Sequence, residues 1–268
     1  MSRTQTTFLR PVKEAPALSL RQQLAPYAKP DAMRAMGQLV ATALPLIISA
    51  AALFWGLAQG FWPALVLTIP AALFIVRLFI IQHDCGHGSY FRSGRANDLV
   101  GCLLSIVTMM PYGAWRRDHA VHHATSGNLA RRGIGDVVTL TVAEYRARSC
   151  WRRFTYRLYR HPAILFVAGP AYVLLVRYRV PLTNPLRDQR CWFSILGTNA
   201  GAAALGLGLA LLVGPVVFVV GWGTALLLAT AIGVWFFYVG PPGSCPASWQ
   251  PQATLSPCPR CAAASLMN

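Results

Sequence analysis

Charged residues are scarce in this chain, and acidic residues are the scarcest. Of 268 residues, 12% are charged, and 8 acidic side chains face 24 basic ones, giving a formal net charge of +16. A typical soluble domain carries about twice that charged share. Since 55% of the residues are hydrophobic and the mean hydropathy is +0.45, the composition argues against a soluble domain and indicates a membrane protein.

The basic excess has a different meaning in a membrane protein than in a soluble one. A basic soluble protein suggests nucleic acid binding, whereas arginine-rich loops of membrane proteins stay cytoplasmic and contact anionic lipid headgroups. We therefore expect a lipid bilayer as a partner and no nucleic acid. The same rule predicts an integral protein of a bacterial inner membrane, with its N-terminus and arginine-rich loops in the cytoplasm.

The cysteines argue against a disulfide framework, and the first residues argue against a cleavable signal peptide. The seven cysteines are odd in number and scattered, so no disulfide framework is implied, and the single C-x-x-C of Cys258 and Cys261 is best explained by chance. Residues 1–31 are polar, basic and rich in proline. They contain no apolar core of a cleavable signal peptide.

Two long stretches lack any charged residue, from Ala35 to Val76 and from Cys191 to Pro259. One membrane span needs about 20 apolar residues, so each stretch has room for a helical hairpin. We expect spans over residues 38–59, 62–82, 192–213 and 216–239. The first hairpin would break around Gln59 to Pro63, and the second would turn at Gly214 and Pro215.

Two other apolar segments, Leu99–Tyr112 and Pro162–Val176, are too short to span. Each has arginines on both sides, so both of its ends are expected in one compartment, and each should lie in the interface or re-enter. The predicted fold is an all-α membrane protein: about four transmembrane helices in two hairpins, a cytoplasmic histidine-bearing cap, and interfacial helices.

Five of the six histidines fall into two tight clusters near the water ends of apolar segments. Residues four apart share one face of a helix, so a helical cluster directs several imidazoles the same way. Clustered neutral imidazoles bind iron, zinc, copper or nickel, and nearby carboxylates orient the rings. The candidate metal ligands are His83, His87, His119, His122 and His123, and the candidate ring-orienting carboxylates are Asp84, Asp118 and Asp136. No catalytic residue beyond the metal ligands is predicted.

Other uses of these histidines are weaker. A single H-x-x-x-H is common, but H-x-x-x-H followed by H-x-x-H-H is a specific pattern. Haem ligation fits poorly, because haem ligands usually lie on facing spans rather than in clustered triplets. The sixth histidine, His161, precedes Pro162 at an expected helix start and is predicted to be structural.

The two clusters resemble those of the membrane fatty acid desaturases, especially the bacterial and plant-plastid, delta-12-like type. The resemblance rests on H-D-C-G-H-G-S from His83 to Ser89 and on R-D-H-A-V-H-H from Arg117 to His123. It continues through residues 127–142 and extends from about residue 30 to Val239.

This resemblance implies a diiron centre with His83, His87, His119, His122 and His123 among its ligands. It also implies a fatty-acyl lipid substrate, dioxygen, and two electrons from a ferredoxin-like donor, with a cis double bond as the product. An acid or base side chain cannot break an unactivated alkyl C–H bond, so the cofactor must remove the hydrogen.

The chain departs from the family pattern in one respect: a third histidine box is expected after the last span, but no histidine follows His161. We therefore expect a cytoplasmic arm over residues 1–34, an incomplete desaturase-like membrane domain over 35–239, and a disordered, aberrant tail over 240–268, consistent with truncation or a frameshift after Val239. The sequence as written would then be inactive. The alternatives are a non-catalytic pseudoenzyme and a related acyl hydroxylase.

Overall fold

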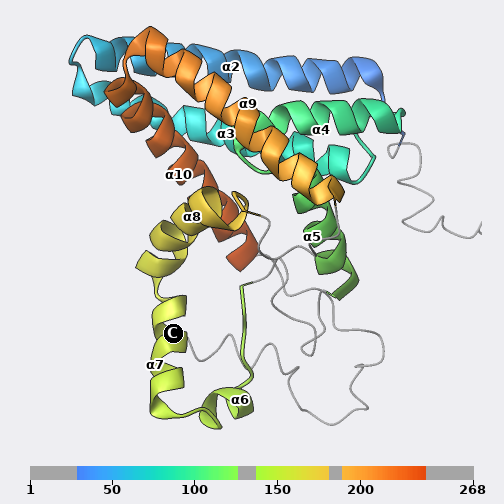
Figure 1. Cartoon of the computed structure of the whole chain (residues 1–268), viewed down its shortest axis with the longest axis vertical. Coiled ribbons are helices and arrows are strands. Elements are labelled where there is room, and N and C mark those ends of the chain that lie inside the picture. The colour runs from blue at the N-terminus through green and yellow to red at the C-terminus, as the bar shows by residue number, and fades with distance from the viewer. Residues whose placement is uncertain (1–28, 126–136, 181–188, 240–268) are drawn as a thin grey trace, which may run out of the picture.

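Helices make up all the regular structure that is described in the computed structural model, which covers residues 29–125, 137–180 and 189–239 (Figure 1). Four helical segments are long and apolar enough to cross a membrane: Ala32–Ala58, Trp62–Gly86, Gln189–Val213 and Pro215–Phe236. The prediction of an all-α membrane protein is confirmed. The described residues contain four such segments, or up to six if each of two bent helix pairs counts as one span.

The first hairpin begins with α2 (Ala32–Ala58), whose N-cap Asp31 accepts a hydrogen bond from the Arg34 amide at 2.8 Å. The helix ends before Gly60, whose φ of 75° few other residues adopt. A short 3-10 helix, η2 (Trp62–Leu67), carries Pro63 in its first turn and continues into α3 (Thr68–Gly86). The break falls where the sequence predicts it. The helix α2 starts earlier than expected, and the return segment of η2 and α3 extends beyond the expected end, to Gly86.

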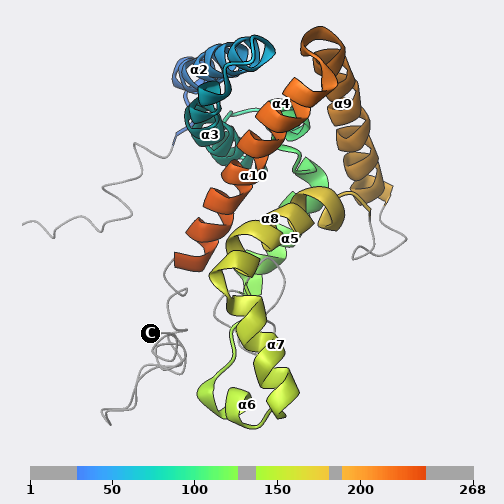
Figure 2. The same ribbon diagram turned by 90° about the vertical axis from the view of Figure 1, so that its left-hand side faces the viewer.

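The second hairpin consists of α9 (Gln189–Val213) and α10 (Pro215–Val239). Gly214 joins them with a φ of 90°, and Pro215 opens α10, where its missing N–H costs nothing. Gly221 lets α10 approach the first hairpin, because a Cβ there would lie 3.1 Å from the Phe54 ring. Figures 1 and 2 show α10 running from the hairpin turn past α3 to the region of α8.

Between the hairpins, α4 (Gly94–Thr108) packs along α3 and then the chain turns sharply into α5 (Tyr112–Thr125). The two helices meet at 101°. Met109 takes a left-handed conformation at the bend, with a φ of 54°. The turn is tight, since a Cβ on Gly101 would collide with the Tyr112 ring at 2.3 Å.

The second short apolar segment also forms helix. After α6 (Val142–Arg146) and α7 (Cys150–Arg160), a π-helix η4 (Ile164–Ala168), a turn of α8 (Gly169–Tyr172) and a π-helix η5 (Val173–Arg177) follow one another. This continuous stretch bends by 59° from α7 and packs against α10 (Figure 2). A bend of this size is compatible with a re-entrant segment and with a broken span, so the predicted re-entrant or interfacial placement stays a prediction.

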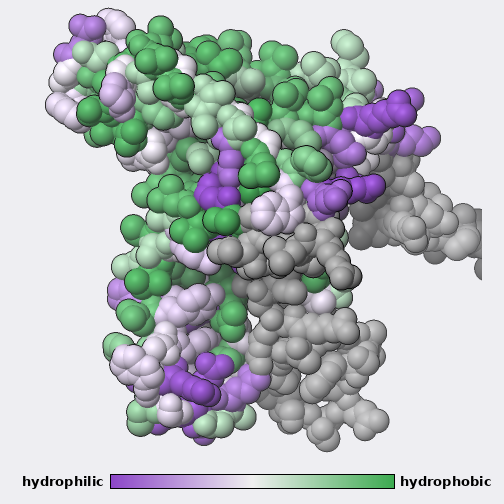
Figure 3. Space-filling model, viewed as in Figure 1, coloured by the Kyte–Doolittle hydropathy of each residue, from purple (hydrophilic) through white to green (hydrophobic). Residues whose placement is uncertain are grey.

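The core lies around α3, which contacts α2, α4 and α10. Its small side chains Ala71 and Ala72 are fully buried, as is Ala225 of α10, so these backbones approach closely. The outer faces of the spans are apolar, with exposed residues such as Ile47 and Leu211. Figure 3 shows this hydrophobic surface over α2 and α9, with hydrophilic residues where both helices begin and around α6 and α7. Such a surface is stable in lipid rather than in water.

Several predictions fall outside the described residues: most of the arm, Asp136 and the tail over 240–268. Of the predicted arm over residues 1–34, the structure describes residues 29–34, and α2 already begins at Ala32.

Candidate metal centre

The first pair of histidines comes from the end of α3. His83 lies in the last turn of the helix, and His87 caps it with a helical backbone, φ −78° and ψ −6°. The spacing of four residues places both rings on one face, with 3.2 Å between their Nε2 atoms. Gly88 then takes a φ of 68°, which ends the helix directly after the second ring.

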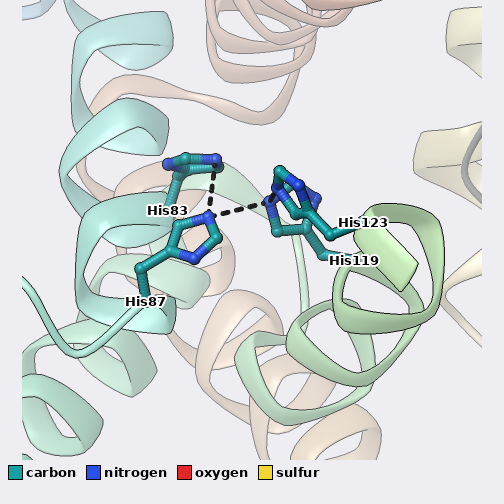
Figure 4. Close-up of side chains that lie close together, drawn as sticks. All are labelled: His83, His87, His119 and His123. Atoms are coloured by element: carbon teal, nitrogen blue, oxygen red, sulfur yellow. Dashed lines mark hydrogen bonds between the residues drawn. The ribbon is translucent and has the colours of Figure 1, made fainter. Parts of the chain in front are cut away.

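The second pair, His119 and His123, comes from α5 and has the same spacing. The two Nε2 atoms lie 3.0 Å apart, and the Nε2 of His119 lies 3.1 Å from that of His87. Figure 4 shows the rings of the two helices pointing toward one another. One ligand atom from each of His83, His87, His119 and His123 can be chosen so that all four lie within 4.8 Å of one another.

These distances fit a single metal ion. Metal–imidazole bonds of about 2.0–2.1 Å place neighbouring ligating nitrogens about 3 Å apart. The three Nε2 separations in the cluster are 3.0, 3.1 and 3.2 Å. Four imidazole nitrogens suit iron, zinc, copper or nickel. The donor set therefore fits one first-row transition metal ion.

The surroundings favour the neutral form of two of these imidazoles, His119 and His87, and metal binding requires the neutral form. Burial, with a contribution from the neighbouring histidines, lowers the pKa of His119 to about 3. Burial and the other rings also lower the pKa of His87. The Nδ1 of His83 lies 3.1 Å from the Oδ1 of Asp84. A hydrogen bond from Nδ1–H to this carboxylate leaves the Nε2 lone pair available to a metal.

Trp115 packs against the histidine cluster, and the sequence analysis did not single it out. Its buried indole stacks on the ring of His119 at 4.6 Å and meets the ring of Phe79 edge-on at 5.3 Å. Gly86 makes room for this indole, because a Cβ there would lie 2.9 Å from it. The signal in the sequence was an aromatic residue four positions before His119, on the same face of α5.

Two other predicted site residues, His122 and Asp118, lie beside the cluster. His122 is half-buried and outside the four-nitrogen group, with its ring 5.7 Å from that of His123. Asp118 accepts hydrogen bonds of 3.4 Å from the guanidinium of Arg177 and from the hydroxyl of Tyr178. Asp136 lies outside the described residues.

A cavity of about 340 Å³ adjoins the cluster. Its polar wall includes Asp118, His119, His122 and Arg177. The rest is mostly apolar and comes from α3, the η4–η5 stretch and α10, including Ile75, Val76, Phe79, Leu165, Val173, Ala229, Gly233 and Val234. The volume lies within the range of small-molecule sites, about 300–1,000 Å³. The arrangement is a predominantly apolar pocket with imidazoles on one wall.

The position of α5, and so of one histidine pair, depends on the bend after α4. The carbonyl of Met110 accepts a 2.7 Å hydrogen bond from the side-chain amide of Gln82. The carbonyl of Met109 accepts one from the guanidinium of Arg179. Arg179 in turn donates to the Oδ1 of Asn199 on α9 at 2.6 Å. Two carbonyls that the turn frees from helical bonding are thus satisfied by α3 and by the region before α9.

Comparison with known proteins adds to this geometry. A family model described as "Fatty acid desaturase" matches residues 60–256. A fatty acid desaturase of Bacillus subtilis is 39% identical over 220 residues, which are 82% of this chain and 62% of that relative. An omega-3 fatty acid desaturase of the endoplasmic reticulum from Vigna radiata is 36% identical over 78 residues, 29% of this chain and 18% of the relative.

A shorter match involves a cyanobacterial enzyme. The sn-1 acyl-lipid omega-3 desaturase (ferredoxin) of Synechocystis is 44% identical over 52 residues, 19% of this chain and 14% of that protein. No solved structure matches the chain. The chain thus spans less than two thirds of the length of these relatives. Because the family model matches well over half of the residues, the chain belongs to the fatty acid desaturase family.

Proposed function

We propose that this chain is the membrane part of a fatty-acyl desaturase that binds iron through its histidine cluster. The observation that supports this most is the apolar cavity next to the four converging imidazoles. In the proposed reaction an acyl –CH2–CH2– unit loses two hydrogens and becomes a cis –CH=CH– unit. These hydrogens, together with two electrons and two protons, reduce one dioxygen molecule to two waters. The electrons would come from a ferredoxin-like donor, as the name of the Synechocystis relative indicates for that protein.

Iron would supply the oxidising power that removes hydrogen from an unactivated C–H bond, which no side chain can do. The protein residues would hold the metal and orient its histidine ligands. His83, His87, His119 and His123 offer the nitrogens, and Asp84 fixes the tautomer of His83. The surrounding apolar side chains would keep water away from the reacting carbons.

The acyl chain would lie in the cavity of about 340 Å³. Apolar walls from Ile75 and Val234 favour a hydrocarbon over water, and His119 and His122 mark the wall nearest the metal cluster. Asp118 and Arg177, which hydrogen-bond to each other, are charged cavity residues that face the polar part of a bound lipid in this proposal.

For the family's diiron cofactor, the four-nitrogen group would hold one ion, and His122 offers a fifth imidazole toward a second. We place the histidines on the cytoplasmic side of a bacterial inner membrane, because arginines flank both histidine clusters in the sequence. The second candidate is a membrane protein that binds a metal without desaturase activity, because four converging imidazoles can bind an ion whether or not the reaction takes place.

The test is the iron content of the detergent-purified chain together with the fatty acids of a host that expresses it. We expect iron of about one ion per chain or more, given four converging imidazoles. His119→Ala should lose it. His161→Ala is the matched control, because His161 instead accepts a hydrogen bond from the Ala163 amide at 3.3 Å. A new unsaturated fatty acid that disappears with His119→Ala supports the desaturase. Iron without product supports the second candidate, and a chain without iron contradicts both.

A further inference from the structure

The helix α7 (Cys150–Arg160) presents apolar side chains outward. Trp151, Phe154 and Leu158 are 71%, 50% and 48% exposed. Their spacing of three and four residues puts them in one stripe along the helix. The rings of Trp151 and Phe154 stack at 5.6 Å, so the stripe is continuous. We call these three residues the α7 stripe.

The opposite face of α7 is held by the rest of the chain. The hydroxyl of Tyr156 accepts a hydrogen bond from the Leu140 amide at 3.2 Å, and that of Tyr159 accepts one from the Val138 amide at 3.2 Å. These contacts fix the rotation of the helix about its axis. The α7 stripe therefore points away from the protein because of specific contacts on the other side.

Arginines surround the stripe and no acidic residue accompanies them. Between Glu144 and Asp188 the sequence contains no aspartate or glutamate, while residues 145–180 contain eight arginines. Arg148 and Arg157 are exposed. The carboxylate of Glu144 accepts hydrogen bonds within the capping box that starts α6. An anionic partner is favoured on this surface.

The end of α7 lies where a span leaves the membrane. The guanidinium of Arg160 sits 4.8 Å from the centre of the Tyr238 ring. Tyr238 comes two residues after the end of the candidate span Pro215–Phe236. Trp235 and Tyr238, exposed at this end of α10, are the aromatic residue types typical of a membrane–water interface. Figures 1 and 2 show α7 extending from this end of the molecule.

We propose that α7 lies on an anionic phospholipid surface. The α7 stripe would insert at the boundary between the headgroups and the acyl chains, and arginines would pair with the phosphates. Apolar insertion combined with basic residues is the usual chemistry of interfacial helices. An acidic soluble protein could pair with the arginines as well. A lipid surface is favoured because Arg160, at the Leu158 end of the stripe, contacts the apolar end of α10, where lipid is already present.

This placement has a consequence for the cavity. Tyr159, on the protein-facing side of α7, is also a cavity-lining residue. A helix anchored in the headgroups would hold this wall of the cavity at the level of the lipid from which an acyl substrate would come. The proposed membrane contact itself does not depend on the desaturase activity.

The experiment measures depth in full-length protein reconstituted into vesicles. An environment-sensitive fluorescent amino acid replaces Phe154 or, as a matched control on the other side of the helix, Arg152. Vesicles contain phosphatidylcholine alone or mixed with phosphatidylglycerol, and a doxyl-labelled lipid is the quencher. We expect quenching at position 154 to be roughly twofold stronger than at 152 and to increase with phosphatidylglycerol. Arg148→Glu combined with Arg157→Glu should abolish that increase.

Equal quenching at the two positions would overturn the proposal. So would a label at position 154 that stays water-exposed in both vesicles and is shielded only when a small acidic ferredoxin is added, which would identify a protein-docking surface. If the label at 154 prevents folding, as judged by aggregation in detergent, Leu158 provides a second site on the same stripe with the same expected result.

Discussion

The side-chain amide of Gln82 donates a 2.7 Å hydrogen bond to the main-chain carbonyl of Met110, 28 residues away. The Oε1 of the same side chain accepts a 2.6 Å hydrogen bond from the hydroxyl of Thr108. Gln82 is fully buried and immediately precedes His83. One amide thus connects the helix of one histidine pair with the bend that aims the other.

The first prediction concerns this amide. Gln82→Leu keeps the size of the side chain but leaves the Met110 carbonyl without its side-chain donor, which costs about 1–3 kcal/mol of unfolding free energy, whereas the Thr108 hydroxyl can still donate to the Leu104 carbonyl at 3.1 Å. Because the bend then loosens, we expect affinity for Co²⁺, a visible-absorbing substitute for iron, to fall by about tenfold or more. Gln59→Leu, at the exposed turn of the first hairpin, is the control. Equal affinities of the two variants would contradict the positioning role of Gln82.

The second prediction concerns Trp115, the indole that stacks on His119 in the histidine cluster. In Gly86→Ala the new methyl group would lie 2.9 Å from the Trp115 indole, which Phe79 holds in place at 5.3 Å. The indole must then press on His119, so we expect a weaker Co²⁺ complex, by about tenfold, with an altered visible spectrum. Gly37→Ala is the control, because its methyl group meets nothing within 4 Å. That change should stabilise α2 by up to about 1 kcal/mol. A spectrum of Gly86→Ala identical to that of the parent chain would show that Trp115 does not position the ring.

Local signals in the sequence were sufficient for the hairpins and for each histidine pair. Gly60 with Pro63 and Gly214 with Pro215 end and restart helices through their own backbone preferences, which need no partner. The spacing of His83 and His87 is a property of any helix. These features were predicted because the residues that cause them are neighbours in the chain.

Features that join distant segments could not be predicted in this way. The pairing of Asp118 with Arg177 connects residues 59 apart, and nothing in the composition of either segment selects the other. The same applies to the 101° bend, which depends on Arg179 and Gln82 reaching carbonyls from two other elements. Which histidines of α5 face His83 and His87 depends on the rotation of α5 about its axis, and that rotation follows from the bend.

The third prediction concerns the depth of the cavity. Gly233 lines it from α10, and a Cβ there meets nothing within 4 Å, so a larger side chain would extend into the cavity. Gly233→Leu should weaken binding of a long-chain fluorescent fatty acid by about tenfold, since a hydrocarbon loses about 0.8 kcal/mol for each methylene it can no longer bury. Short-chain analogues should be affected less. Gly223→Leu adds the same side chain to the same helix at another open position that is not among the cavity-lining residues, and should leave binding unchanged. Equal loss in both variants would place the acyl chain elsewhere.

The fourth prediction compares two aspartates that each pair with an arginine. Asp118 is 16% exposed and meets Arg177, 26% exposed, at 3.4 Å, whereas Asp98 is 57% exposed and meets Arg116, 47% exposed, at 2.8 Å. Breaking the more buried pair leaves a cation poorly hydrated, so Asp118→Asn should cost about 2–3 kcal/mol, below the 3–5 kcal/mol typical of a fully buried pair. Asp98→Asn should cost about 1 kcal/mol or less, although its pair is shorter, because water screens an exposed pair. Denaturation in detergent measures both. A larger loss of unfolding free energy with Asp98→Asn would mean that the distance within an ion pair, rather than its burial, determines how much it stabilises the protein. Asp118 would then not be a structural anchor of the cavity wall.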